Sequence, residues 1–157
     1  MKFILVKGSR WAGKTETIKE ISKRLKPTAI RRIHISDTSP TLLTSIDPSI
    51  GISNGNYLLT VRDKCILVVT DSPTQQRTRI TTIVEAAHKL NLKPSLALIS
   101  INTIERLKNF DTSNELEKFG KCIHNVKIWR IPSIKYDLTE EWNKRVSYLL
   151  SIILHNL

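Results

Sequence analysis

Short apolar runs alternate with amphipathic segments along most of the chain. The run over residues 3–6 is typical of a buried strand, and residues 66–69 form a second run of this kind. Between such runs, apolar residues recur at helical spacing, as they do at Ile18, Ile21 and Leu25. The pattern predicts strands over residues 2–6, 29–35, 57–61, 65–69, 95–101 and 126–131, and helices over residues 14–26, 73–91 and 102–109 and in a last segment that Asp137 or Thr139 can cap.

The order of these elements indicates a fold class. Strands that alternate with helices are typical of a parallel or mostly parallel sheet, with helices on both faces and right-handed crossovers. A chain of 157 residues is ordinarily one domain, and no repeat or linker divides this one. We therefore expect a single α/β domain over residues 1–157.

The segment over residues 38–56 departs from this alternation. It is rich in Ser, Thr, Pro, Gly, Asp and Asn, and its apolar residues cluster over positions 42–46. Connections of this length are often functional, so we expect a loop or a lid-like excursion with at most one helical turn. The strand predicted just before it leads into Asp37, and ligands of open α/β sheets bind at the carboxyl ends of strands.

The composition adds a strong positive charge. Lys and Arg number 25 against 14 Asp and Glu, which gives a formal net charge of +11 and an isoelectric point near 9.9. Such an excess favours anionic partners, including nucleotides and nucleic acid. The basic residues are spread along the chain rather than gathered in one block, so both a solvated basic exterior and a nucleic-acid surface remain open.

The cysteines and the apolar runs bear on the compartment. Cys65 and Cys122 lie far apart, without CxxC spacing or a histidine cluster, which favours reduced thiols over a disulfide or a zinc site. No apolar run approaches the length of a membrane span, and the first residues lack the pattern of a secretory signal. We therefore expect a cytoplasmic location without membrane contact, and four structural histidines.

Residues 8–15 read GxxxxGKT and directly follow the first predicted strand. Glycines at this spacing allow the backbone to curl, so that successive amide groups point at phosphate oxygens. The lysine supplies a positive charge for the β- and γ-phosphates, and the threonine supplies a hydroxyl for Mg²⁺. The helix that follows directs the positive end of its dipole at the anion. The residues predicted to bind the nucleotide are Gly8, Ser9, Arg10, Trp11, Ala12, Gly13, Lys14, Thr15 and Glu16.

These residues resemble the P-loop NTPase superfamily, whose Walker A motif they match without a departure. The resemblance implies a three-layer α/β/α P-loop NTPase fold with a mostly parallel five-stranded sheet, and it implies ATP and Mg²⁺ as cofactors. Residues 66–71 also have the shape of a Walker B segment, which is an apolar strand that ends in an aspartate. The resemblance therefore implies that Thr15 and Asp71 hold the metal ion.

Absent features narrow the type of P-loop protein. The DxxG and NKxD motifs of GTPases are missing at Asp71 and after the strand that ends at residue 101, which favours ATP over GTP. Ser72 stands where many ATPases carry a glutamate that orients water. The small nucleotide and metabolite kinases remain, and the chain resembles them in size and in the order of its elements.

The resemblance to these kinases implies further site residues. An acceptor site would lie in the excursion over residues 37–56, and residues 109–121 would form a short lid. Catalytic roles would fall to Lys14, to Asp37, which would orient or deprotonate an acceptor hydroxyl, and to Arg106, which would neutralise the transferred group. The lid segment has lysines but no arginine, and the acceptor segment has no recognisable arginine-based phosphate site. Asp37 facing solvent and Arg106 covering its own helix stay open as alternatives.

Three functions remain open at this point. The first is a small ATP-dependent kinase that acts on an unidentified small molecule. The second is an ATPase or ATP-dependent switch that acts with nucleic acid or a protein partner, which the net charge favours. The third is a nucleotide-binding adaptor with little turnover. Arg77 and Arg79 follow Asp71 closely enough to lie near phosphates, or else they face water.

Overall fold

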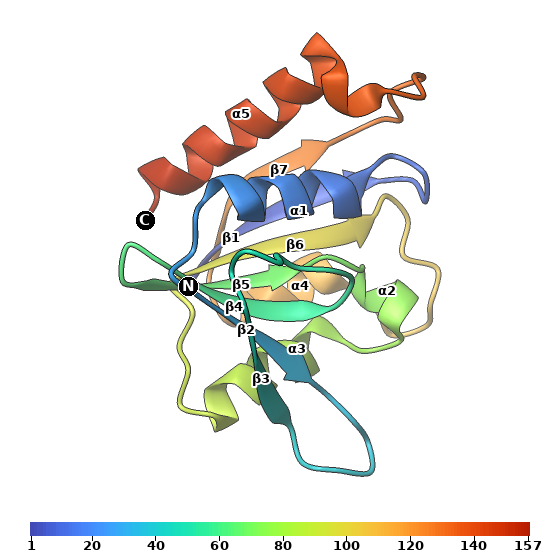
Figure 1. Cartoon of the computed structure of the whole chain (residues 1–157). Coiled ribbons are helices and arrows are strands. Elements are labelled where there is room, and N and C mark those ends of the chain that lie inside the picture. Colours follow the sequence, from blue (N-terminus) through green and yellow to red (C-terminus); the bar gives the residue numbers. More distant parts are fainter.

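A mixed seven-stranded β-sheet runs through the molecule, with its strands in the order β3-β2-β4-β5-β6-β1-β7 (Figure 1). The computed structural model describes all residues from 1 to 157. The strands are β1 (Lys2–Gly8), β2 (Ala29–His34), β3 (Leu42–Ile46), β4 (Asn56–Val61), β5 (Lys64–Val69), β6 (Leu96–Asn102) and β7 (Lys121–Lys127). The helices are α1 (Lys14–Arg24), α2 (Pro73–Gln76), α3 (Ile80–Lys89), α4 (Thr112–Glu117) and α5 (Glu140–His155), with a 3-10 helix η1 (Tyr136–Leu138).

The prediction of a mostly parallel five-stranded P-loop sheet was wrong. The pairs β2–β3, β2–β4 and β4–β5 are antiparallel, and only β1–β6, β1–β7 and β5–β6 are parallel. Strands β4 and β5 form a hairpin whose turn residues Arg62 and Asp63 have φ angles of 50° and 60°. A turn this short cannot hold a crossover connection, so β4 runs antiparallel to β5. It thereby separates β2 from the parallel strands.

The segment over residues 38–56 contains an edge strand, where the sequence predicted a loop. Strand β3 pairs with β2 from Leu42 opposite His34 to Ile46 opposite Ile30. Its contact with the rest of the molecule is slight, because most of its residues are exposed and Leu42 is 60% exposed. The strand has only five residues, and a short edge strand limits pairing with other chains.

Helices cover both faces of the sheet. Helices α1 and α5 lie side by side on one face (Figure 1), where Val146 joins a core that includes Ile4. Helices α3 and α4 cover the opposite face, where Ile83 and Leu116 join a second core that includes Leu5. Successive strand residues point to opposite faces, so β1 supplies both cores. Strands β1, β5 and β6 are thus buried on both sides, and their carboxyl ends are left to carry loops.

Two predicted helices differ in the structure. The helix predicted over residues 73–91 is divided into α2 and α3, because Arg77 adopts a left-handed φ of 54° and ends α2. A helix was predicted over residues 102–109, but Asn102 ends β6 and residues 103–109 form bends and a turn. In this segment the carboxylate of Glu105 accepts hydrogen bonds from the backbone N–H and the hydroxyl of Thr112, at 2.8 and 2.6 Å. These bonds tie the segment to the first residue of α4.

The carboxyl-terminal third also differs from prediction in detail. Strand β7 begins at Lys121, ahead of the predicted strand, and the predicted lid over residues 109–121 contains α4. Thr139 caps α5, since its hydroxyl accepts a hydrogen bond from the Trp142 backbone N–H at 3.2 Å. Asp137, the alternative cap, lies in η1.

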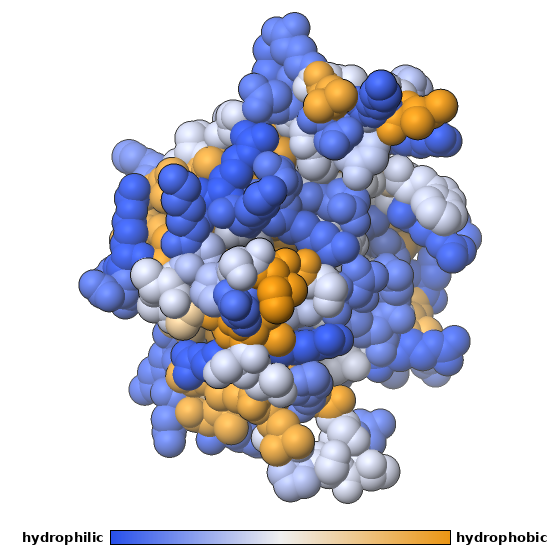
Figure 2. Space-filling view, in the orientation of Figure 1, coloured by the Kyte–Doolittle hydropathy of each residue, from blue (hydrophilic) through white to orange (hydrophobic).

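The surface is largely hydrophilic. Figure 2 shows polar residues over most of one face, with apolar residues in separate small groups. No helix of the structure combines the length and the apolar character needed to cross a membrane.

Candidate functional site

Loop 8–15 connects β1 to α1 at the carboxyl end of the parallel strands. A Cβ atom on Gly8 would lie 2.7 Å from Cβ of Ala12 and 3.1 Å from the carbonyl oxygen of Ile128, so no larger residue fits. Gly13, the residue before α1, has a φ of 88°, which favours glycine. Both glycines of the motif are therefore needed for the shape of the loop.

Lys14 folds back beneath this loop. Its Nζ donates hydrogen bonds to the carbonyl oxygens of Gly8 and Ser9, both at 2.8 Å, and to Oδ1 of Asn102 at 3.3 Å. The side chain pairs with no carboxylate, and the residue is only 7% exposed. Desolvation by burial lowers its pKa. An anion bound in the loop would supply the counter-charge that this buried ammonium lacks.

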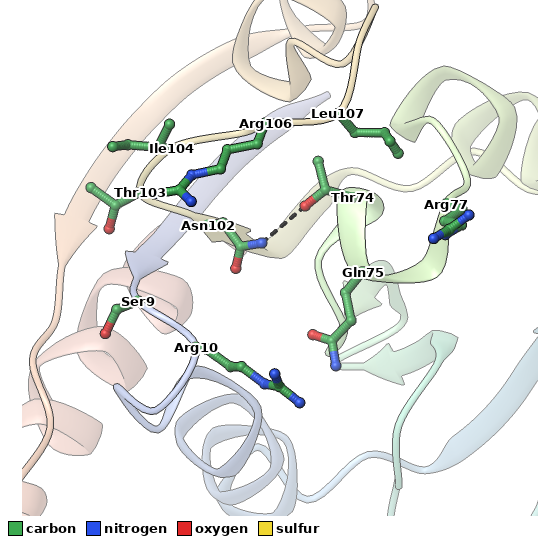
Figure 3. Close-up of a pocket in the computed structure, with 10 residues that line it drawn as sticks. All are labelled: Ser9, Arg10, Thr74, Gln75, Arg77, Asn102, Thr103, Ile104, Arg106 and Leu107. Carbon is green, nitrogen blue, oxygen red and sulfur yellow. Dashed lines mark hydrogen bonds between the residues drawn. The ribbon is translucent and has the colours of Figure 1, made fainter.

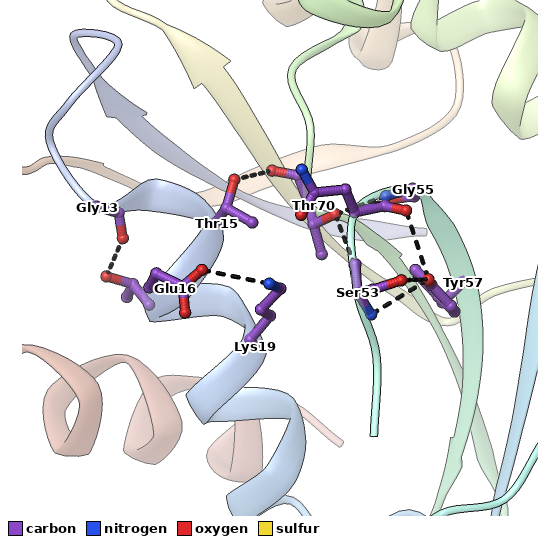
Figure 4. A network of polar contacts seen from close by, with 10 residues as sticks. Gly13, Thr15, Glu16, Lys19, Ser53, Gly55, Tyr57 and Thr70 are labelled. Carbon is purple, nitrogen blue, oxygen red and sulfur yellow. Dashed lines mark hydrogen bonds and ion pairs between the residues drawn. The ribbon is translucent and has the colours of Figure 1, made fainter. Parts of the chain in front are cut away.

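Thr15 and Asp71 lie close together, although they follow different strands, β1 and β5, which β6 separates. The Thr15 hydroxyl donates a hydrogen bond to the carbonyl oxygen of Thr70 at 3.1 Å, and Asp71 is the next residue (Figure 4). One carboxylate oxygen of Asp71 is buried and has no hydrogen-bond partner. Burial raises the pKa of this carboxyl, and the charges of Lys19 and Arg32 oppose that shift.

The oxygen atoms at this point suit a magnesium ion. Mg²⁺ prefers oxygen ligands and is commonly bound by one or two carboxylates together with substrate phosphates and water. The buried, unpartnered oxygen of Asp71 and the hydroxyl of Thr15 provide that kind of ligand. No group of three or more His, Cys, Asp or Glu side chains could hold a metal by itself. An ion here would therefore need further ligands from a nucleotide and water.

A cavity of about 560 Å³ opens beside the loop, and residues far from the motif in the sequence also line it. Arg145 of α5 donates hydrogen bonds to the carbonyl oxygen of Ala12, at 3.2 Å, and to that of Trp129. Burial lowers the pKa of this guanidinium, and Glu141 opposes the shift. No local motif marks Arg145, because tertiary packing brings it to the loop from the last helix of the chain. The lining residues beyond the loop are Glu16, Asn54, Asp71, Gln75, Arg130, Ile131, Ser133, Tyr136, Trp142 and Arg145.

Asn102 links this cavity to a second one. It ends β6, the strand between β1 and β5, and so lies between the loop and the segment after Asp71. While Oδ1 accepts from Lys14, Nδ2 donates a hydrogen bond to the Thr74 hydroxyl at 3.0 Å (Figure 3). Its position at a strand end was the only sequence signal that could have found it.

The second cavity has a volume of about 660 Å³ and holds Arg106 (Figure 3). Arg10 and Gln75 line both cavities, so the two spaces adjoin. The next residue, Gln76, lines neither cavity. Its side-chain amide pairs with that of Asn56 at 2.8 and 2.9 Å and also donates a hydrogen bond to the Asp71 carbonyl oxygen at 2.7 Å.

The structure does not bring Asp37 to the other predicted residues. Asp37 is exposed, follows β2, and lines neither cavity. Glu16 lines the first cavity and forms an ion pair with Lys19 at 3.2 Å. The predicted loop residues, Lys14, Thr15 and Asp71 therefore gather at one place, Arg106 lies in the adjoining cavity, and Asp37 stands apart.

Comparison of the chain with protein-family models, with curated proteins and with solved structures found no match.

Proposed function

We propose that this chain is a P-loop protein that binds ATP with Mg²⁺ in loop 8–15 and transfers the terminal phosphoryl group to a small acceptor. The observation that carries the proposal is the buried Lys14 ammonium, which meets only neutral oxygens, together with the nearby Thr15 hydroxyl and the buried, unpartnered oxygen of Asp71. We also propose a cytoplasmic location, which the two free cysteines support, since reduced thiols are typical of that compartment.

Each residue would act through position and charge. Backbone N–H groups of loop 8–15 would bind phosphate oxygens, and Lys14 would pair with the β- and γ-phosphates. Thr15 and Asp71 would hold Mg²⁺, which neutralises phosphate charge when bound. Asn102 would keep Lys14 in place from the side of the second cavity. Arg106 would neutralise charge on the transferred group from the adjoining space.

The test is nucleotide binding by calorimetry with Mg²⁺ and ATP, followed by a product screen with terminally labelled ATP and small acceptors. Lys14→Ala should reduce ATP affinity by roughly tenfold to a hundredfold, because it removes a charge-assisted contact. Lys23→Ala is the matched control, since Lys23 is an exposed lysine further along the same helix. Equal ATP affinity in wild type and Lys14→Ala would contradict the site, and labelled inorganic phosphate as the only product would contradict transfer to an acceptor.

A second candidate is an ATP-dependent protein that acts with single-stranded nucleic acid. Trp11 and Trp129 are 73% and 65% exposed, and each lies under a cation, Arg10 at 5.2 Å and Lys127 at 5.5 Å. Exposed aromatic side chains beside basic ones are typical of surfaces on which bases stack. Binding of a labelled oligonucleotide should then weaken with salt, with a log–log slope of roughly 0.7 for each phosphate contacted. Absence of oligonucleotide binding at low salt would contradict a function with single-stranded nucleic acid. Tight ATP binding without any product would favour a nucleotide-binding adaptor.

A further inference from the structure

We propose that the second cavity binds a small molecule that carries a phosphate monoester, and that this molecule accepts the phosphoryl group. The inference rests on the proposed function and adds the place and the chemical class of the acceptor. The cavity has a volume of about 660 Å³, which is within the usual range for small-molecule sites. No residue of the 37–56 segment lines it, so the site differs from the acceptor region that the sequence predicts.

The charge of the cavity is positive and unbalanced. Arg10, Arg77 and Arg106 line it, and no Asp, Glu or His side chain does. None of these arginines forms an ion pair, whereas the nearby Arg79 pairs with the buried Glu115 at 3.0 Å. Figure 3 shows the three side chains around Asn102 and Gln75. Arginines that form no ion pair around one cavity favour an anionic ligand.

The backbone at Arg77 is a separate observation. Its φ of 54° is uncommon for a residue other than glycine, and this conformation ends α2 after Gln76. A continuous helix, as the sequence predicts, would carry the side chain onward along the helix surface. The break instead leaves Arg77 at the cavity wall. Unfavourable backbone conformations of this kind are concentrated at functional sites.

The cavity also lies where an acceptor must lie. Arg10 and Gln75 line both this space and the space beside loop 8–15. Asn102 accepts a hydrogen bond from Lys14 on one side and donates to Thr74 on the other, at 3.3 and 3.0 Å. A ligand beside Asn102 would therefore face the terminal phosphate of a nucleotide held by Lys14, which is the arrangement that direct transfer requires.

The lining residues narrow the class of ligand. Guanidinium groups present a planar pair of donors that matches the geometry of phosphate oxygens. The apolar residues of the cavity are Ile104 and Leu107, and no aromatic side chain is available for stacking on a nucleobase. These features suit a phosphorylated metabolite without a base better than they suit a nucleotide.

The absence of carboxylate and imidazole groups from the lining bears on the nucleophile. A hydroxyl acceptor must lose a proton, and the cavity offers no usual base to take it. A phosphate monoester has an ionised oxygen already. That oxygen attacks the γ-phosphorus, the bond between the γ-phosphorus and the β–γ bridging oxygen breaks, and its electron pair leaves with ADP. The product is a phosphoanhydride, no proton is transferred, and the total charge is unchanged.

The experiment first saturates the protein with Mg²⁺ and a non-hydrolysable ATP analogue. Ribose 5-phosphate and glycerol 3-phosphate are then titrated by calorimetry, beside ribose, glycerol, glycerate and AMP. We expect the phosphate monoesters to bind and the neutral compounds not to bind. Arg77→Gln and Arg106→Gln should each weaken this binding by at least about tenfold, while Arg77→Gln retains its affinity for the analogue. Arg62→Gln, in the exposed turn between β4 and β5, is the matched control.

The outcomes separate this inference from the proposed function. Failure of the analogue to bind wild type contradicts the nucleotide site, and the phosphate monoesters titrated alone still test the cavity. Equal binding by wild type and both cavity variants, or no binding of any phosphate monoester, overturns the inference. Preference for glycerate or for AMP overturns the ligand class. Phosphorus NMR of wild type with ATP and the bound ester should show a new phosphoanhydride, and a new monoester instead would overturn the assignment of the nucleophile.

Discussion

The two halves of the sheet differ in strand direction and in the residues that they carry. Strands β5, β6, β1 and β7 are parallel, and β5, β6 and β1 are almost wholly buried. The residues of the candidate site lie mainly at the carboxyl ends of the parallel strands and in the loops that follow them. Strands β3, β2 and β4 are antiparallel to their neighbours, and β3 lies at an exposed edge. The difference indicates that the parallel half forms the site and the antiparallel half supports it.

That support is visible in two contacts. The hydroxyl of Thr70, at the end of β5, accepts a hydrogen bond from the Gly55 backbone N–H at 2.8 Å and donates to the Ser53 carbonyl oxygen at 3.1 Å (Figure 4). The amide pair between Asn56 and Gln76 joins the start of β4 to the end of α2. The antiparallel half thus fixes the segment around Asp71 without supplying its chemistry.

The largest expected effect compares one leucine from each half. Leu98→Ala in β6 should lower the free energy of unfolding by about 2–5 kcal/mol, because the side chain is fully buried and its loss leaves a cavity. Leu42→Ala in β3 should cost less than about 0.5 kcal/mol, since Leu42 is 60% exposed. Urea unfolding followed by circular dichroism measures both. Equal losses would mean that the exposed edge strand β3 contributes as much to stability as the buried strand β6.

A smaller effect is expected at Arg145, which joins loop 8–15 to the end of β7. Arg145→Met keeps the length of the side chain but removes the hydrogen bonds to the carbonyl oxygens of Ala12 and Trp129. We expect a loss of about 1–2 kcal/mol in unfolding free energy and a weaker affinity for ATP, since the side chain is only partly buried. Lys144→Met is the control, because Lys144 pairs with Glu140 at the exposed surface. If both variants had similar unfolding free energies and ATP affinities, the Arg145 hydrogen bonds would not stabilise loop 8–15.

The elements of the parallel half were predictable because their signals are local. The glycines, Lys14 and Thr15 occur in one short motif, and the apolar run before Asp71 identifies its strand. The strands predicted over residues 57–61 and 65–69 leave only three residues between them, which requires an antiparallel pair, yet the predicted sheet was mostly parallel. The prediction failed where neighbouring elements had to be combined.

Other features had no local signal. Strand β3 lies within a segment, residues 38–56, that has the composition of a loop, and its pairing with β2 makes it a strand. Arg77 is not a glycine, so nothing in the sequence marked its left-handed conformation or the break between α2 and α3. Arg145 reaches the site from the last helix through tertiary packing alone.

The ionisation of Asp71 gives a weaker, pH-dependent effect. Burial raises its pKa above the ordinary value of 3.8, so the ionised carboxylate opposes folding. Wild type should therefore lose stability as the pH rises from the ordinary value to the raised one, and Asp71→Asn should lack this loss. At neutral pH and without ligand, Asp71→Asn should be more stable than wild type. Addition of Mg²⁺ and ATP should stabilise the variant less than it stabilises wild type. Thermal unfolding at several pH values, with and without Mg²⁺ and ATP, tests both signs.

The smallest effect is expected at Asp37, in the antiparallel half. Strand β2 points in the same direction as β1, so Asp37 does lie near the carboxyl edge of the sheet, as the sequence predicted. However, β4, β5 and β6 lie between β2 and β1 in the sheet. At about 4.8 Å between neighbouring strands, β2 and β1 are separated by roughly 19 Å. Asp37→Ala should therefore change ATP affinity and the rate of phosphoryl transfer by less than about twofold. Calorimetry and the labelled-ATP assay measure these quantities, and a large loss of rate would mean that the 37–56 segment closes over the site during the reaction.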